Sequence, residues 1–293
     1  MVNYRSRFDT VFNIINITLL LFLSALTLYP FWEVIKVSFS DPLEVGRIGY
    51  RLWPLKTSME GYTHVFQNQF VWIGYKNTIV RVILAVSVQM ILSILTAYPL
   101  SKKRLPHRNI FTMLIVFTMF FSGGLIPEYL LVSNILNLDD TVWSMVLPYA
   151  INTFGMLVMR NYFMSLPNEL EESAKIDGAG ELTVLLRIIL PISMPILVTV
   201  GLWGIISNWN AWFDCIIYIR DSNKYVLQAI LRRIVIDSIP EFDGRGAIEK
   251  TILINAEVIK CSTIVIATLP VMLIYPFLQK YFIKGILIGS LKG

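Results

Sequence analysis

Polar and aromatic side chains crowd one short stretch of an otherwise apolar part of the sequence. Residues 207–214 read Ser-Asn-Trp-Asn-Ala-Trp-Phe-Asp. Amide and carboxylate groups suit sugar hydroxyls and indoles present flat faces to sugar rings, so the stretch could contact a saccharide. A helix would put Asn208 and Trp212 on one face, since they are four residues apart. The alternative, an interfacial tryptophan belt with capping asparagines, stays open. The candidates are Asn208, Trp209, Asn210, Trp212 and Asp214, with Asn152 added from another span.

Charged side chains gather in a second stretch, which begins at Ser165 and reads SLPNELEESAKIDGAGELTVLLRIILPISMPIL. Asn168 and Glu171 have the spacing of a helix N-cap and its N3 partner, and acidic side chains in a first turn suit the helix dipole. Gly178 predicts a break after this short helix, and a second helix is expected from about Glu181 until Pro191 turns the chain. Such a pair could lie on lipid head groups, but its acidic start suits a protein partner better than anionic lipid.

Several kinds of catalytic chemistry find no support in the sequence. The phosphate-cradling pattern G-x-x-x-x-G-K-[ST] is missing and no Gly-Lys pair occurs, so ATP hydrolysis would need a separate polypeptide. His64 and His107, the two histidines, fall in expected loops and leave little for a histidine-based catalyst. Cys215 and Cys261 lack C-x-x-C spacing and predict no metal site. Both lie near expected outer ends of spans, so a disulfide stays open beside the plainer interpretation of two small apolar side chains.

The composition indicates a membrane protein. Of the 293 residues, 55% are hydrophobic and 15% are charged, and the mean hydropathy is +0.63. Soluble domains carry roughly 25% charged residues, so much of this surface is expected to face lipid. The net charge of +5 forms no basic stripe, which argues against nucleic acid as a partner and favours basic loops on one side of a bilayer.

Six segments are long and apolar enough to cross a bilayer, because a span needs about 20 mostly apolar residues. We therefore expect an all-α polytopic protein of about six transmembrane helices. The first segment lacks a small-residue cleavage site and is too long for a signal-peptide core, so we expect it to be retained. Ser122-Gly123-Gly124 with Pro127 suggests a break in the third helix. The expected helices cover about residues 11–34, 77–100, 110–132, 142–163, 195–217 and 262–282.

Basic residues set the expected orientation. The loop 101–109 holds four basic residues, whereas the loop 133–141 holds two aspartates and no basic residue. The first loop is therefore expected in the cytoplasm and the second outside, which puts both termini in the cytoplasm. The expected parts are a cytoplasmic N-terminus (1–10), a transmembrane domain (11–284) with a cytoplasmic segment (165–192) and two long outer loops (38–76 and 218–261), and a cytoplasmic tail (285–293).

The cytoplasmic segment resembles a loop of binding-protein-dependent ABC importers, whose membrane subunits carry the pattern E-A-A, three residues, G, nine residues, I-x-L-P. Ser173 is the one departure from that pattern. The wider chain resembles the carbohydrate-uptake class, to which the maltose permeases belong, and then a subgroup for oligosaccharides of alginate and aldouronate type. The pattern falls on Glu172, Ser173, Ala174, Gly178, Ile188, Leu190 and Pro191, and the wider likeness on Tyr29-Pro30, Leu166-Pro167, Ile176–Ala179, Phe120–Pro127, Met159–Asn161 and Gly289–Gly293.

The resemblance implies a permease subunit of the bacterial cytoplasmic membrane that moves an oligosaccharide inward by alternating access. It implies a second homologous permease, two ATP-binding cassette subunits inside and a solute-binding protein outside, with ATP and Mg²⁺ in the ATPase and no cofactor in this chain. The coupling segment would dock in the ATPase, with Glu172, Ala174 and Gly178 at the contact. The loop 218–261 would face the binding protein. The tail 285–293 is either a further ATPase contact or a frayed end.

Other functions remain as alternatives. A permease for another solute class would share the same coupling segment. A secondary transporter driven by an ion gradient would need charges buried within spans, and only Arg81 and Asp214, near span ends, approach this. A membrane-embedded enzyme would need a nucleophile and base, and none is visible. Gln89 and Asn152 are lone polar residues in mid-span, which more often join helices by hydrogen bonds than contact a ligand.

Overall fold

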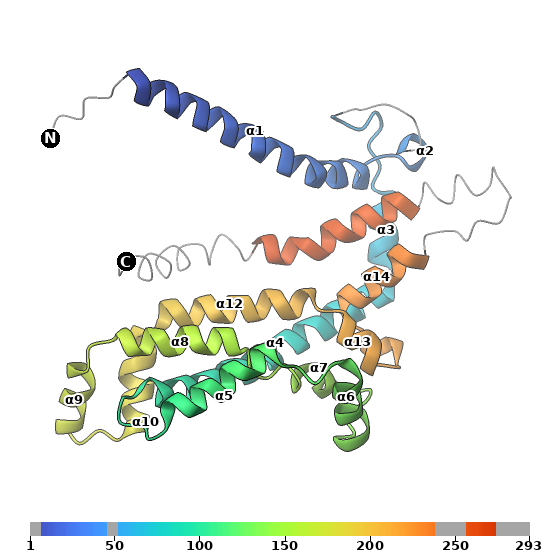
Figure 1. Cartoon of the computed structure of the whole chain (residues 1–293). Coiled ribbons are helices and arrows are strands. Elements are labelled where there is room, and N and C mark those ends of the chain that lie inside the picture. Colours follow the sequence, from blue (N-terminus) through green and yellow to red (C-terminus); the bar gives the residue numbers. More distant parts are fainter. Residues whose placement is uncertain (1–6, 46–51, 238–255, 274–293) are drawn as a thin grey trace. The chain divides into compact units, whose positions relative to one another are not determined.

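The computed structural model describes residues 7–45, 52–237 and 256–273, and in these ranges the regular secondary structure is helical apart from one antiparallel bridge between Ser40 and Thr57 (Figure 1). The all-α prediction is confirmed for these residues. The chain divides into two compact units, residues 1–68 with 231–268, and residues 69–230 with 269–293. Each unit is described by itself.

The first unit is built on a long apolar helix, α1 (Arg7–Ser38), followed by α2 (Pro42–Val45) and α3 (Glu60–Gln67). Ser38 joins the elements, because its side chain shares a hydrogen bond of 2.8 Å with the Tyr62 hydroxyl. The carbonyl of Ser38 accepts a hydrogen bond of 3.2 Å from Ser262, on the helix Ala256–Leu273. Gly61 permits this close packing, since a Cβ there would lie 2.3 Å from the Ser262 hydroxyl.

The second unit is organised around α4 (Gln69–Ser101), which packs against α8 (Thr153–Ser165) and α12 (Met194–Asn210). The shorter elements are α5 (Arg108–Phe120), α6 (Leu125–Leu130), the π-helix η1 (Leu131–Ile135), α7 (Trp143–Val146), α9 (Glu169–Ile176), α10 (Glu181–Val184), the π-helix η2 (Leu185–Ile189), α11 (Leu190–Ile192), α13 (Phe213–Tyr218), the 3₁₀ turn η3 (Ser222–Lys224) and α14 (Leu227–Asp237), which runs past the boundary of the unit. Figure 1 shows α5 alongside α4 and α8, and α9 and α10 near one end of α8 and α12.

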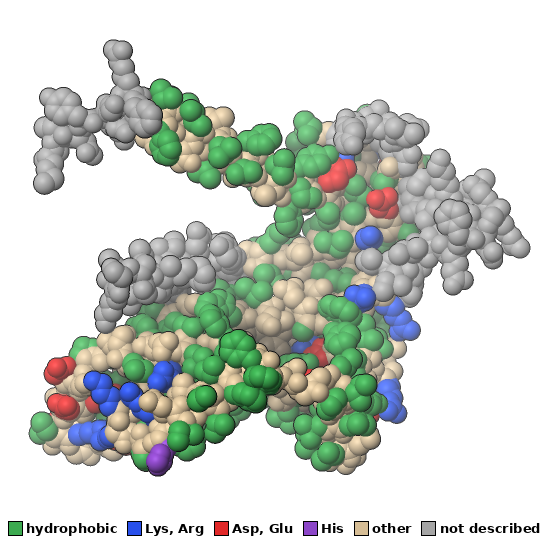
Figure 2. Space-filling model, viewed as in Figure 1, with side chains coloured by type: hydrophobic (Ala, Val, Ile, Leu, Met, Phe, Trp, Pro, Cys, Tyr) green, Lys and Arg blue, Asp and Glu red, His purple; other side chains and the backbone are tan. Residues whose placement is uncertain are grey.

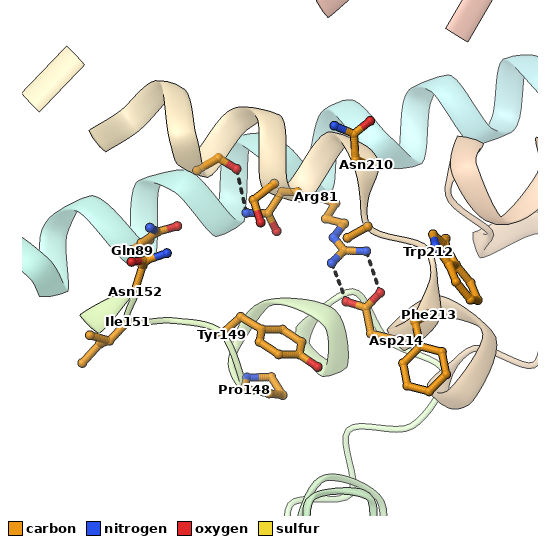
Figure 3. Close-up of a pocket in the computed structure, with 14 residues that line it drawn as sticks. Arg81, Gln89, Pro148, Tyr149, Ile151, Asn152, Asn210, Trp212, Phe213 and Asp214 are labelled. Carbon is orange, nitrogen blue, oxygen red and sulfur yellow. Dashed lines mark hydrogen bonds and ion pairs between the residues drawn. The ribbon is translucent and has the colours of Figure 1, made fainter. Parts of the chain in front are cut away.

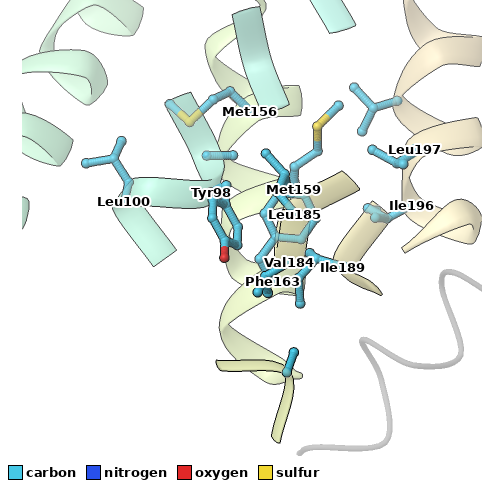
Figure 4. Packing of buried hydrophobic residues seen from close by; sticks show 13 residues of the cluster. Tyr98, Leu100, Met156, Met159, Phe163, Val184, Leu185, Ile189, Ile196 and Leu197 are labelled. Atoms are coloured by element: carbon cyan, nitrogen blue, oxygen red, sulfur yellow. The ribbon is translucent and has the colours of Figure 1, made fainter. Parts of the chain in front are cut away.

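The largest buried apolar cluster of the second unit lies where α4, α8 and the segment from α9 to α12 meet (Figure 4). Met156 and Met159 of α8 are fully buried, and Tyr98 of α4 packs edge-on against Phe163 with ring centroids 6.4 Å apart. Burying such side chains contributes about 1.5–3 kcal/mol each. Figure 2 shows basic and acidic side chains gathered at this end of the unit, over α9 and α10.

Helix continuity differs from the prediction of about six spans, of which the third alone is expected to be broken. Three helices in the described ranges are long and apolar enough to cross a membrane: Val11–Ser38, Gln69–Ser101 and Ala256–Leu273. The number rises to five if each of two bent pairs is one span: Arg108–Phe120 with Leu125–Ile135, bent by 108°, and Glu181–Ile192 with Met194–Asn210, bent by 82°. The first bend is the break predicted at residues 122–124.

The fourth and fifth expected helices end differently from the prediction. The fourth is interrupted between α7 and α8, at residues 147–152, where Pro148 lacks a backbone donor and Asn152 caps α8 by accepting a hydrogen bond of 2.8 Å from the Gly155 amide. The fifth ends at Asn210, because Ala211 is extended. The second begins at Gln69, eight residues before the predicted start.

Cys215 and Cys261 are free thiols, each buried in its own unit. The predicted tail 285–293, residues 274–282 of the sixth span and residues 238–255 of the outer loop lie outside the described residues.

Two helix glycines provide a matched test of the packing around α4. A Cβ on Gly74 would lie 3.0 Å from the Leu227 Cα and 2.6 Å from the Ile230 side chain, whereas a Cβ on Gly201 would meet only the Met90 sulfur, at 3.8 Å. We expect Gly74→Ala to destabilise the protein by about 1–3 kcal/mol through overpacking. Gly201→Ala should leave stability unchanged or raise it, because alanine is the better helix former. Thermal unfolding of both purified variants in detergent tests this, and equal melting temperatures would contradict the packing.

Candidate functional site

A polar cavity of about 390 Å³ opens between α4, residues 148–152 and the end of α12 (Figure 3). The cavity brings together five of the six residues that the sequence suggested for solute contact. The sixth, Trp209, is buried and faces Tyr75 instead, with ring centroids 6.0 Å apart. The lining comprises Arg81, Gln89, Pro148, Tyr149, Ile151, Asn152, Gly204, Ser207, Asn208, Asn210, Ala211, Trp212, Phe213 and Asp214.

The shared helical face predicted for Asn208 and Trp212 is wrong, because the helix ends between them. Ala211 takes an extended backbone conformation, with φ −75° and ψ 134°, and a new short helix, α13, begins at Phe213. Trp212 therefore reaches the cavity from the joint between two helices. The residues meet at a break between two helices, which helical spacing alone does not predict.

A buried ion pair forms one wall of the cavity. Arg81 of α4 donates from Nη1 to Asp214 Oδ1 at 3.0 Å and also pairs through Nη2 with Oδ2, so the contact is bidentate. The side chains are 1% and 5% exposed. The amide of Cys215 donates to the same Oδ1 at 2.9 Å, which satisfies the start of α13. Arg81 Nε is buried without a hydrogen-bond partner among the described residues. Because the cation and anion neutralise each other, this wall carries no net charge.

Further hydrogen bonds hold the segment after α12 against α4. Asn77 Nδ2 donates to the carbonyls of Asn223 at 2.9 Å and Tyr225 at 3.0 Å. Thr78 Oγ1 accepts from the Leu227 amide at 2.8 Å. Together with Arg81 these side chains form a polar stripe on α4, since positions 77, 78 and 81 share one helix face. The stripe fixes residues 211–227 and therefore one side of the cavity.

The asparagines at the cavity retain capacity for a ligand. Asn208 Nδ2 donates to the Gly204 carbonyl and Asn210 Nδ2 to the Ile206 carbonyl, each at 3.0 Å. Each bond uses one of the two donors and leaves the amide able to bind further groups. Asn208 is buried, with 9% of its surface exposed, whereas Asn210 is exposed. In the ranges described, no three His, Cys, Asp or Glu side chains are arranged to hold a metal ion.

Ion pairs outside the apolar segments tie two loops together beside the cavity. Lys224 Nζ lies 2.6 Å from Asp140 Oδ2, and Arg220 Nη2 lies 3.2 Å from Asp139 Oδ2. The hydrogen bond from Lys224, aided by the backbone amides of residues 220 and 221, lowers the pKa of Asp140 to about 2. The contact therefore contributes stability at and above about pH 4, and loses it as the pH falls from about 4 to about 2.

The segment from α9 to α11 forms the helix, joint and second helix that the sequence predicts. Gly178 has φ +82°. The amide of Ala179 donates to the Ala174 carbonyl at 2.9 Å and that of Gly178 to the Lys175 carbonyl at 3.0 Å, which is a Schellman C-cap. The side-chain cap predicted for Asn168 is wrong: its backbone is helical, and its carbonyl accepts from the amides of Glu171 and Glu172. The predicted helix start at Glu169 is confirmed.

The seven motif residues divide into exposed and packed positions. Ala174 is buried in the apolar cluster, and Ile188 and Leu190 are half-buried against it. Glu172, Ser173, Gly178 and Pro191 are exposed. Ile176, at the end of α9, is 87% exposed although it is large and apolar. The sequence could have singled out Ile176 as an apolar residue beside a charged stretch, but spacing alone does not say which face it takes.

Comparison with known proteins gives consistent relatives over nearly the whole chain. Residues 8–288 match the model of the family described as binding-protein-dependent transport system inner membrane component. The chain is 39% identical over 290 residues to protein LplC of Bacillus subtilis (strain 168), covering 99% of this chain and 98% of that one. It is 39% identical over 285 residues to the polygalacturonan/rhamnogalacturonan transport system permease protein YtcP of the same organism, covering 97% and 99%.

A solved structure is also similar to this chain. It belongs to a bacterial ABC transporter involved in the import of the acidic polysaccharide alginate, with a TM-score of 0.86 and 32% identity over 96% of this chain and 100% of that chain. These matches confirm the resemblance drawn from the sequence.

The ion pair at the cavity gives a prediction about stability. Asp214→Asn or Arg81→Met should destabilise the protein by about 3–5 kcal/mol, because each leaves one buried group without its partner. The double variant Arg81→Met/Asp214→Leu should be closer to the parent protein, since it removes both charges. Thermal unfolding in detergent measures all three. Single variants that melt with the parent protein, or a double variant whose loss is the sum of the single losses, would contradict this role.

Proposed function

Because the chain belongs to the family of binding-protein-dependent transport system inner membrane components, we propose that its polar cavity is part of the path of an oligosaccharide that enters the cell by alternating access. The family supplies the membrane-spanning permease of ABC importers. We propose six transmembrane crossings with both termini in the cytoplasm, as the basic loop 101–109 favours.

The proposed complex contains several other polypeptides. A second, homologous permease would complete the pathway, and an extracytoplasmic solute-binding protein would face the loop 218–261. Two ATPase subunits would bind inside and hold ATP and Mg²⁺, one of them at α9. The exposed apolar surface of α1 suits lipid or the second permease, because its side chains from Val11 to Leu28 include many large hydrophobic ones that are about half exposed.

The single observation that carries the solute path is the cavity, where asparagine amides and Trp212 converge beside a neutralised ion pair. Amides bind hydroxyls as donors and as acceptors, and an indole covers the apolar face of a sugar ring. Relatives whose names or titles specify polygalacturonan and alginate support a saccharide cargo. Since Asp214 cancels the charge of Arg81, this cavity suits hydroxyls, and a carboxylate on the cargo would be recognised elsewhere in the complex.

The path predicts that two substitutions in the cavity differ in effect from a control substitution outside it. Asn210→Ala should raise the KM for oligosaccharide uptake by about two- to twelvefold, the value of one hydrogen bond, and Trp212→Ala should also raise it. Trp209→Phe is the control, because Trp209 packs on Tyr75 outside the cavity. ATP-dependent uptake by the complete importer in proteoliposomes measures this, with alginate-type, galacturonan-type and neutral oligosaccharides as cargo. Unchanged KM values for all of them in the cavity variants would refute the path.

We propose that the exposed face of α9 docks in the ATPase and transmits its motion to the spans. Glu172, Ser173 and Gly178 share that face, and Ile176 adds an apolar side chain that a protein cleft would cover. The buried motif residues Ala174 and Ile188 would act by packing, which keeps the docked helix fixed to the rest of the unit. A rigid helix seated in a soluble partner can drive a rigid-body motion of the attached helices.

Substitutions in the docking face should uncouple ATP hydrolysis from uptake while the chain still inserts. Gly178→Pro is incompatible with φ +82°, because proline fixes φ near −65°. Glu172→Lys reverses an exposed charge, and Ile176→Asp removes the apolar contact. Gly180→Ala is the control, since its φ is negative and the space around it is open. Uptake and ATPase rates in proteoliposomes give the readout, and wild-type transport by the first two variants would exclude the docking role.

The ion-gradient alternative rests on the buried Arg81–Asp214 pair, which is the arrangement that a proton- or ion-coupled carrier would need. Family membership favours ATP as the energy source. Uptake that persists without ATP but stops when an ionophore collapses the gradient would reverse this preference.

A further inference from the structure

The exposed helical segment is fastened to the end of α4 on both sides of its glycine joint. On α9, Glu171 forms an ion pair with Lys102, the first residue after α4. On α10, Glu181 accepts a hydrogen bond of 3.3 Å from the Tyr98 hydroxyl and pairs with Arg104. We call these contacts, made by Tyr98, Lys102 and Arg104 to Glu171 and Glu181, the α4 clamp.

A further ion pair closes the clamp across the joint. Lys175 of α9 lies 2.8 Å from Glu181 of α10, and this hydrogen bond lowers the pKa of Glu181. The two helices are therefore held together by a charge contact in addition to the Schellman cap. The joint at Gly178 is therefore bridged by an ion pair between α9 and α10.

The Lys102–Glu171 pair is the protected part of the clamp. Its side chains are 17% and 13% exposed, whereas those of Arg104 and Glu181 are 61% and 53% exposed. Lys102 Nζ also lies 4.1 Å from the centroid of the Tyr98 ring, in a cation–π contact. Solvent screens an exposed pair strongly and a sheltered pair much less, so Lys102 and Glu171 dominate the electrostatic attachment.

Packing and a cap support the same attachment. Ala174, on the inner side of α9, belongs to the apolar cluster that contains Tyr98 and Phe163 (Figure 4). Arg160 of α8 donates from Nε to the Leu100 carbonyl at 3.1 Å, which satisfies one of the last carbonyls of α4. The end of α4 is thus held between α8 and α9.

Two routes lead from this segment toward the cavity, and they differ in continuity. The chain itself continues into α12, but across an 82° bend at Ser193 that follows the π-helix η2. By contrast, α4 is one helix from Gln69 to Ser101, and its Arg81 and Gln89 line the cavity. From Arg81 to Ser101 the helix rises about 30 Å, at 1.5 Å per residue.

We propose that α4 is the lever that carries motion of the docked segment to the cavity, and that Lys102 and Glu171 are the positioning residues that engage it. The inference rests on the proposed docking of α9 in the ATPase, and adds which membrane helix receives the motion. The continuous helix α4 transmits a displacement along its length, whereas a bend of 82° lets α12 absorb part of it.

A double-mutant cycle on the complete importer tests the lever. Lys102→Met and Glu171→Gln should each lower the number of substrate molecules imported per ATP hydrolysed by about fivefold or more, within the range of energetic coupling between protein sites. The double variant should lose little beyond either single variant, because both remove the same contact. Lys102→Arg should restore most of the ratio. Lys103→Gln is the control, since Lys103 is exposed and one position along the same loop.

Three results would overturn the proposal. One is an unchanged transport-to-hydrolysis ratio in both single variants. Another is strict additivity in the double variant. The last is failure of the ATPase to copurify with Lys102→Met, which would make the residue part of docking instead of transmission. The Glu172→Lys variant in the same assay separates this inference from its premise. If Glu172→Lys uncouples and Lys102→Met does not, the lever alone fails, and if neither uncouples, the docking of α9 fails with it.

Discussion

The constraint on which this fold depends is that backbone and side-chain polar groups in an apolar surrounding must find partners within the protein. Three helix starts in the described residues meet it with a side-chain oxygen. Asn152 accepts from the amide of Gly155 after the break at 147–152, and Asp214 accepts from the amide of Cys215 after the break at 211–212. Thr78 accepts from the amide of Leu227 in the same way. Two of these groups also line the cavity, so the residues that make the breaks tolerable are those that give it polarity.

Much of the architecture could be predicted from local sequence patterns. Gly178 predicts its own positive φ, and the apolar run of α4 predicts a long helix, because both depend only on neighbouring residues. The break near Ser122 and Gly124 follows from the same kind of local chemistry. For this reason the helical segment 165–192 could be described nearly completely from the sequence, including the place of its joint. The N-cap of Asn168 is the exception, because a helix start can use a backbone carbonyl as readily as a side chain.

Contacts between distant residues could not be predicted in this way. Arg81 and Asp214 lie 133 positions apart, and each looked like a lone charge near a span end. Helical spacing put Asn208 and Trp212 on one face, but the chain leaves the helix at Ala211, which has an extended backbone. No residue type at this position signals the end of the helix. The interruption of the fourth expected helix could not be predicted either, since membrane helices often tolerate a proline such as Pro148. In each case tertiary partners decide between local conformations of similar energy.

The two functional regions share α4, and this limits how the protein can move. The polar stripe of Asn77, Thr78 and Arg81 binds residues 211–227 by hydrogen bonds and an ion pair. Sliding α4 past that segment would leave several buried polar groups without partners, at about 1–3 kcal/mol for each. Moving both together leaves every such bond intact. Residues 148–152, which line the cavity on another side, make none of these bonds to α4. A concerted motion of α4 and residues 211–227 would therefore keep the charge of Arg81 paired with Asp214.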